Sequence, residues 1–149
     1  MEKSTGRHFP EEYVAFCQIH GGEIDPLGVF FDGCPFVPLT TGLPTFLKVR
    51  DMAKDVRTYH SYLEDEWTNV SFSELDGNGL HFQTTATPTN LCPLYDVGHG
   101  VAASLQYRSI EALLLTMAEC LNEGLLSVIT GEPLSDYSKI RMVAKKFNA

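Results

Sequence analysis

A glycine-rich turn between two alternating segments is the sequence feature that most restricts the fold. Apolar residues alternate with polar ones at Val70 and Phe72 before the turn, and at Leu80 and Phe82 after it. The turn, Asp76–Gly79, contains two glycines and an asparagine, residue types that accept positive φ angles. A period of two on both sides of such a turn predicts a β-hairpin.

Apolar residues with helical spacing come before the hairpin. Pro10 followed by two acidic residues predicts a helix start, and the apolar stripe behind it ends at Gly21–Gly22. Thr45 can cap a second helix, which we expect to end near Tyr62. Two helices are therefore expected before the sheet.

Two more helices are expected after the hairpin. Ser109 is a good cap for the clearest helix of the chain, and Gly124 stops it. Ser135 is the expected cap of a terminal helix that reaches Phe147 and carries a basic outer side. We expect the apolar side of the first of these helices to lie on the core: Ile110, Leu113, Leu114, Met117, Ala118 and Leu121.

Further short strands complete the pattern. Val29–Phe31, Leu94–Val97 and Val101–Gln106 are expected strands, and the last two follow the hairpin directly. Sequential strands joined by short turns pair antiparallel, and helices outside the run can cover one face. The predicted fold is therefore α+β, with an antiparallel meander of about four to five strands under packed helices, in one domain over residues 1–149.

Charge is distributed unevenly along the chain. The net charge is −8, and the stretch from Thr58 to Ser138 has eleven acidic residues against one base, Arg108, a net −10. Such a surface repels phosphate backbones and steers basic partners toward it. We therefore expect no direct nucleic-acid binding and a basic protein partner. A surface that only keeps the protein soluble is the alternative.

Cysteine usage and hydropathy indicate a protein of a reducing compartment. Cys17, Cys34, Cys92 and Cys120 form no CxxC pair, so buried thiols are expected, rather than a redox or metal site. No apolar run approaches the ~20 residues of a membrane span, and the start of the chain is polar. We expect a cytoplasmic protein that does not contact a membrane.

Catalytic motifs are missing from the sequence. Gly77–Gly79 lies between two expected strands and lacks a P-loop lysine, and neither GxSxG nor HExxH occurs. Asp76 and Asp96, at ends of adjacent strands, could form an acid–base pair, but aspartate beside glycine also accepts hydrogen bonds from its own turn. A small hydrolase using His99 and Asp96 is a further alternative. We expect no enzyme, no cofactor and no metal.

Four segments together resemble the SUKH superfamily, named for a fungal cell-wall-assembly regulator. Phe9–Gly22 is similar to the opening helix of that family, and Trp67–Phe82 to its central hairpin. Pro93–Gly100 resembles the next strand and turn, and Ser109–Glu123 the closing helix. The resemblance covers about residues 9–124 and leaves the helical extension 134–147 unmatched.

The resemblance implies a non-catalytic function. Bacterial members are chiefly immunity proteins that bind and neutralise a cognate polymorphic toxin, often a nuclease, and others are regulatory binding modules. The resemblance supplies no catalytic residues. We therefore expect a protein that binds and covers a basic toxin domain, as a monomer or a homodimer. The alternative is a regulatory adaptor with an exposed apolar contact patch. The expected contacts are Glu64, Asp65, Glu66, Asp76 and Asp96, with Trp67 and Tyr95 as aromatic anchors.

Overall fold

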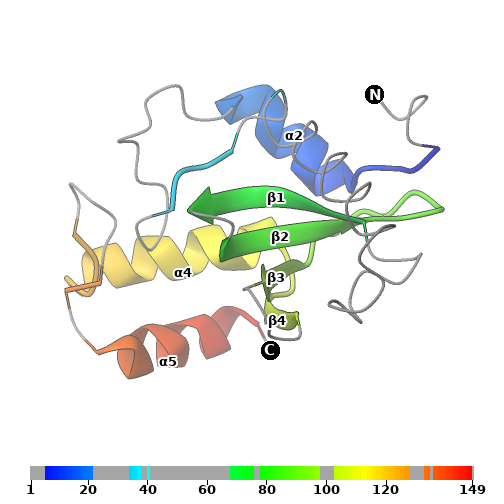
Figure 1. Ribbon diagram of the computed structural model, residues 1–149. Coiled ribbons are helices and arrows are strands. Elements are labelled where there is room, and N and C mark those ends of the chain that lie inside the picture. The colour runs from blue at the N-terminus through cyan, green and yellow to red at the C-terminus, as the bar shows by residue number, and fades with distance from the viewer. Residues whose placement is uncertain are drawn as a thin grey trace.

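The computed structural model describes residues 6–21, 34–37, 40, 68–75, 78–97, 103–127, 133–134 and 136–148. In these residues an antiparallel sheet lies beside three helices (Figure 1). The α+β class and the antiparallel sheet are thereby confirmed. The helix expected to end near Tyr62 and the strand expected at Val29–Phe31 lie outside the described residues.

The sheet is a meander of consecutive strands. Its order is β1-β2-β3-β4, formed by β1 (Thr68–Leu75), β2 (Asn78–Thr84), β3 (Leu94–Val97) and β4 (Ser104–Tyr107). The predicted hairpin is confirmed, because Leu75 pairs with Asn78 and the register continues to Thr68 and Thr84. β4 extends one residue beyond its predicted end.

Helix α2 (Glu11–His20) ends where the sequence predicts, and it begins one residue later than predicted, because Pro10 is its N-cap and not its first helical residue. Its first amides, of Glu11 and Glu12, donate to the carbonyl oxygens of Thr89 and Asn90. At the other end Gly21 has φ of 60°, and its N–H donates to the Cys17 carbonyl over 2.9 Å. A left-handed residue closes a helix in this way at little cost only when it is glycine.

Helix α4 (Ile110–Asn122) has the predicted cap. The Ser109 hydroxyl oxygen accepts from the Ala112 amide over 3.0 Å. The expected buried side is only partly correct: Ile110 and Leu113 are buried, whereas Leu114, Ala118 and Leu121 are exposed. The buried face is turned toward Ala112, Thr116 and Cys120, because α4 packs against a second helix as well as the sheet.

That second helix is α5 (Tyr137–Phe147). Its cap is Asp136 and not the predicted Ser135: the Asp136 carboxylate accepts from the Ser138 amide over 2.9 Å. Ile140 and Val143 of α5 form a small cluster with Cys120 of α4. The terminal helix is thus held by α4 and not by the centre of the sheet.

The main core lies between the sheet and the helices α2 and α4. Phe82, Leu94 and Tyr107 are register partners on β2, β3 and β4, so they share one sheet face. Tyr13 of α2 lies on that face, with its ring centroid 4.1 Å from that of Phe82. Ile110 and Leu113 of α4 belong to the same buried cluster. Both helices therefore cover the same face of the sheet.

Candidate partner-binding surface

Five of the predicted contact residues lie outside the described residues: Glu64, Asp65, Glu66, Trp67 and Asp76. The prediction that they contact a partner stays a prediction. The structure does place the remaining two, Tyr95 and Asp96, which are adjacent on β3. The candidate surface is therefore built from β3 and its neighbours.

Tyr95 is the centre of a row of side chains that crosses the sheet. Its register partners are His81 on β2 and Leu105 on β4. Directly opposite residues in a sheet place their side chains on one face, about 4.5–5.5 Å apart. Since Phe82 and Leu94 point to the helices, this row lies on the opposite face. It brings an imidazole, a phenol and an aliphatic side chain together.

Exposure within the row increases toward the edge of the sheet. His81 is buried, Tyr95 is half-buried, and Leu105 is 57% exposed. Asp96 is exposed and pairs with Ser104 at the start of β4. Partial burial raises the pKa of the Tyr95 phenol above its ordinary value. The β3–β4 surface, defined here as Tyr95, Asp96 and Leu105, thus combines an aromatic, an acid and an exposed leucine.

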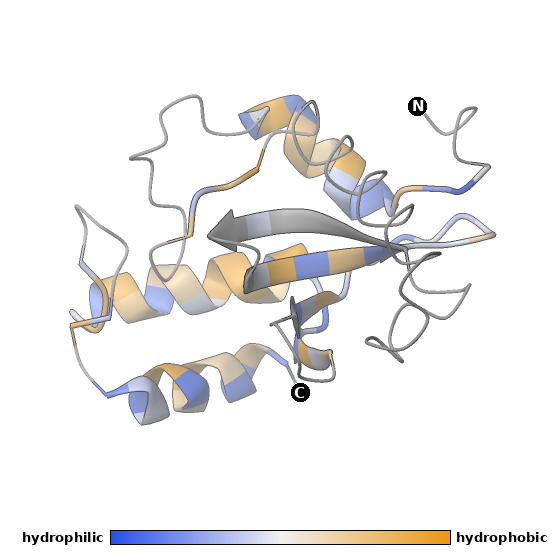
Figure 2. Ribbon diagram, in the orientation of Figure 1, coloured by the Kyte–Doolittle hydropathy of each residue, from blue (hydrophilic) through white to orange (hydrophobic). Residues whose placement is uncertain are grey.

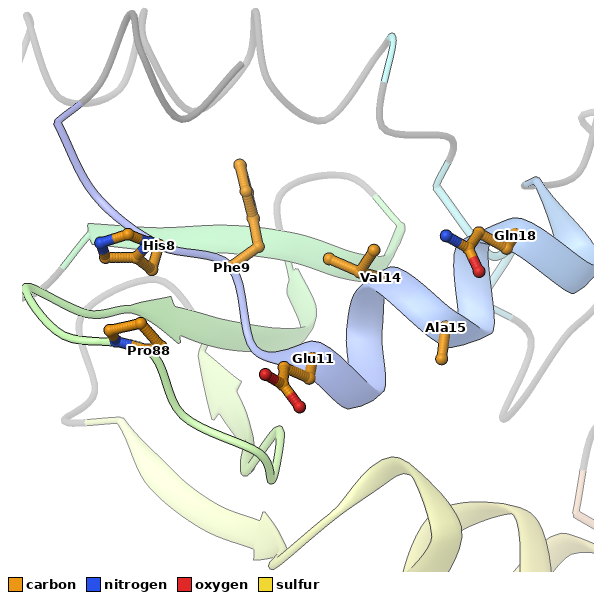
Figure 3. Close-up of a pocket in the computed structure, with 7 residues that line it drawn as sticks. All are labelled: His8, Phe9, Glu11, Val14, Ala15, Gln18 and Pro88. Carbon is orange, nitrogen blue, oxygen red and sulfur yellow. The ribbon is translucent and has the colours of Figure 1, made fainter.

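A second candidate is an open groove beside the first turns of α2, with a volume of about 380 Å³. Its walls come from α2, from the segment before it and from Pro88 (Figure 3). In Figure 3 the Ala15 side chain points toward the side on which α4 lies, whereas Val14 and Gln18 point to the other side. Glu11 supplies an exposed carboxylate. The groove has the size to receive a side chain of a partner.

Glu12, next to the groove, has a structural function that the sequence did not reveal. Its carboxylate accepts from two backbone amides, of Cys92 and of Glu111, each over 2.8 Å. Glu111 is in the first turn of α4, where the helix dipole favours a negative charge. From its place after Pro10, Glu12 was expected only to mark the start of its own helix. Glu12 instead joins the start of α2 to the start of α4.

The cysteines have the environment of structural thiols. Cys92 and Cys120 are buried, Cys17 and Cys34 are half-buried, and none of the four forms a disulfide. Burial raises the pKa of Cys92 well above its ordinary value, and the charge of Glu12 adds to this effect. Burial also raises the pKa of Cys17. A protonated thiol is a poor nucleophile and a poor metal ligand.

The alternative catalytic site is only half described. Asp96 is placed, but His99 lies outside the described residues, so the predicted hydrolase pair is not tested. Among the residues that the structure describes, no group of three or more His, Cys, Asp or Glu side chains could hold a metal ion. Within the same residues, no helix has the length and hydropathy needed to cross a bilayer.

Comparisons with protein-family models, with curated proteins and with solved structures found no match for this chain. The resemblance to the SUKH superfamily therefore depends on the four sequence segments alone.

Proposed function

We propose that this chain is a cytoplasmic, bacterial, non-catalytic binding protein that neutralises a cognate toxin by covering the toxin's active surface. The observation that carries the proposal is the β3–β4 surface, where Leu105 is 57% exposed beside Tyr95 and Asp96. Tyrosine is enriched at protein contact sites, because its ring is apolar and its hydroxyl can form a hydrogen bond. The SUKH-like fold belongs to the proposal, and the order of helix, hairpin, two strands and helix supports it.

Electrostatics support a basic partner for this surface. Asp96 is exposed and lies within the stretch of net charge −10. Acidic side chains at the rim of a contact raise the association rate with a basic toxin domain, such as a nuclease, more than they raise affinity. Tyr95 and Leu105 would supply the desolvated centre of the contact, and Asp96 its rim.

The test measures binding to the C-terminal domain of a secreted toxin encoded beside this chain. Tyr95→Ala should weaken binding by about tenfold or more, because it removes a central anchor. Asp96→Lys should slow association at low salt, with a smaller effect at high salt. Asn122→Ala, an exposed change on α4, is the matched control. Unchanged affinity in Tyr95→Ala and unchanged rates in Asp96→Lys would refute this contact surface.

A regulatory adaptor of the cell-wall-regulator type is the second candidate. That alternative expects an exposed apolar patch, and exposed apolar side chains on α2 and α4 favour it. Protection of cells separates the two candidates. Cells that express this chain should survive the cognate toxin if the chain is an immunity protein. If they die and the purified proteins do not bind, the adaptor replaces the immunity protein as the favoured function.

A further inference from the structure

The outer side of the helices carries apolar residues that the fold leaves uncovered. Ile19 on α2 is 77% exposed, and Leu91, between the sheet strands β2 and β3, is 57% exposed. On α4, Leu114 and Leu121 are exposed as well, although their spacing alone would place them in the core. A single exposed leucine needs no explanation, but several on neighbouring elements do.

These residues form two stripes, one on each helix. Ala15 and Ile19 are four residues apart on α2, and Leu114, Ala118 and Leu121 follow at steps of four and three on α4, so each set shares one helix side. The Glu12 carboxylate joins the starts of the two helices, which lie at the same end of the molecule in Figure 1. Met117, half-buried on the same flank of α4, packs on the core that α2 also covers.

Leu91 lies near the starts of the two helices, at the end of the stripes. Its neighbour Cys92 donates its amide to Glu12, and its other neighbour Asn90 accepts from the Glu12 amide. The helix-layer surface is therefore defined by Ala15, Ile19, Leu91, Leu114, Ala118 and Leu121. Two exposed carboxylates, Glu11 and Glu111, lie in the first turns of its two helices, so one end of this apolar surface is acidic.

Helix α5 has the complementary chemistry on its own outer side. Met142 is 67% exposed, and Arg141 and Lys145 beside it are exposed too. Figure 2 shows the hydrophilic bands of α5 next to the largely hydrophobic α4. Lys146 pairs with Glu119 of α4 over 3.0 Å, with Glu123 at 3.7 Å, so this base is turned toward α4. A methionine between two bases thus faces outward from the molecule.

We propose that a second copy of this chain covers the helix-layer surface. In a two-fold dimer, the outer side of α5 from each copy lies on α2 and α4 of the other copy. Met142 then contacts the apolar stripes, while Arg141 and Lys145 approach Glu11 and Glu111 of the other chain. A two-fold interface forms each contact twice, so one complementary pair of surfaces is sufficient.

Charge favours this arrangement over a dimer in which α5 packs on α5 of the other copy. A two-fold contact of α5 with its own copy would bring like charges together, which is unfavourable. Packing of the basic α5 on the acidic ends of α2 and α4 pairs opposite charges instead. The β3–β4 surface is on the far side of the sheet and stays accessible, so this inference does not depend on the proposed toxin contact.

The experiment measures the mass of the whole chain in solution by light scattering and sedimentation over a range of concentrations. The wild type should have twice the mass of one chain. Ile19→Asp and Met142→Asp should each give a monomer, because each places a charge in the contact. Val14→Asp is the matched control: Val14 is also exposed on α2 but points away from α4, and this variant should remain a dimer. Thermal unfolding of each variant shows that it is folded.

A charge exchange tests the pairing itself. Glu11→Lys and Lys145→Glu should each raise the dimer dissociation constant, by about tenfold at low salt, and the double variant should recover most of the loss. A wild type that is monomeric at every concentration would overturn the inference. So would dissociation of the Val14→Asp variant to the same extent as Ile19→Asp, or a double variant that is no better than the singles. Toxin binding, measured separately, reports only on the proposed function.

Discussion

The Glu12 carboxylate on α2 accepts a hydrogen bond of 2.8 Å from the backbone amide of Glu111 on α4. The two residues are 99 positions apart in the chain. Through its second oxygen, Glu12 also holds the amide of Cys92, just before β3. One side chain therefore joins the starts of two helices to the segment that enters the third strand.

We predict that Glu12→Gln lowers the free energy of unfolding by about 1–2 kcal/mol, because a carboxamide has one acceptor oxygen and no charge for the start of α4. Chemical denaturation followed by circular dichroism measures the effect. Asp96→Asn is the control, since its carboxylate is exposed on β3, away from this junction, and it should change stability by less than about 0.5 kcal/mol. Equal stability of both variants would show that the junction contributes nothing.

Asn148 provides a second junction, between the end of α5 and the edge of the sheet. Its side-chain amide donates to the Gln106 carbonyl over 3.0 Å, and its oxygen accepts from the Arg108 amide over 2.9 Å. These two contacts imitate the pairing of a neighbouring strand and occupy part of the edge of β4. Asn148→Ala should cost about 1 kcal/mol and speed hydrogen exchange at the Arg108 amide. Unaltered exchange at Arg108 would contradict the junction.

The Asp136 cap predicts that the stability of the first turn of α5 depends on pH. The pKa of Asp136 lies below its ordinary value of 3.8, chiefly because the Ser138 amide donates to the carboxylate. A lowered pKa in the folded state means that the stabilisation is complete above the unfolded value and is lost as pH falls through the folded value. Acidification below about pH 4 should therefore fray the start of α5.

Asp136→Asn separates this effect from the titration of other carboxyl groups, because the asparagine oxygen can still accept from Ser138 but does not titrate. Hydrogen exchange at the α5 amides, compared between wild type and variant from pH 5 to pH 2, measures the difference. The two proteins should diverge only at the acidic end. Parallel behaviour over the whole range would exclude Asp136 as the group responsible.

The raised thiol pKa values predict slow alkylation of the folded protein. Cys92 is fully buried, and burial with the nearby Glu12 charge keeps its thiol protonated. At pH 8 it should react with iodoacetamide only as fast as the protein opens, whereas unfolding should expose it to rapid labelling. Mass spectrometry of digested samples identifies the labelled residue. Labelling of Cys92 in the folded state at the rate of a free thiol would show that the packing around it is open.

Local signals in the sequence were sufficient to predict most of the helices and strands that the structure describes. The turn at Asp76–Gly79 predicted the hairpin, and the Pro10 and Ser109 signals predicted the starts of α2 and α4. Each of these signals acts within a few residues, through φ preferences or orphan backbone amides, so it can be read without a tertiary structure. The start of α5 was one residue off because both Ser135 and Asp136 are good caps.

The buried side of α4 could not be predicted from its spacing. Leu114 and Leu121 are more apolar than Thr116, yet Thr116 is buried and the leucines are exposed. Thr116 tolerates burial because its hydroxyl donates to the Ala112 carbonyl over 2.8 Å. The position of α5, which covers Cys120, decides which side of α4 faces inward.

The sequence by itself determined the class of the fold, the hairpin and the helix ends, because these follow from interactions between near neighbours in the chain. Only the tertiary structure decided which side of each helix is covered, that Glu12 and Asn148 join distant elements, and that Tyr95 and Leu105 share a face. Those outcomes depend on contacts between residues far apart in sequence, and their free energy is set by packing that no local pattern encodes.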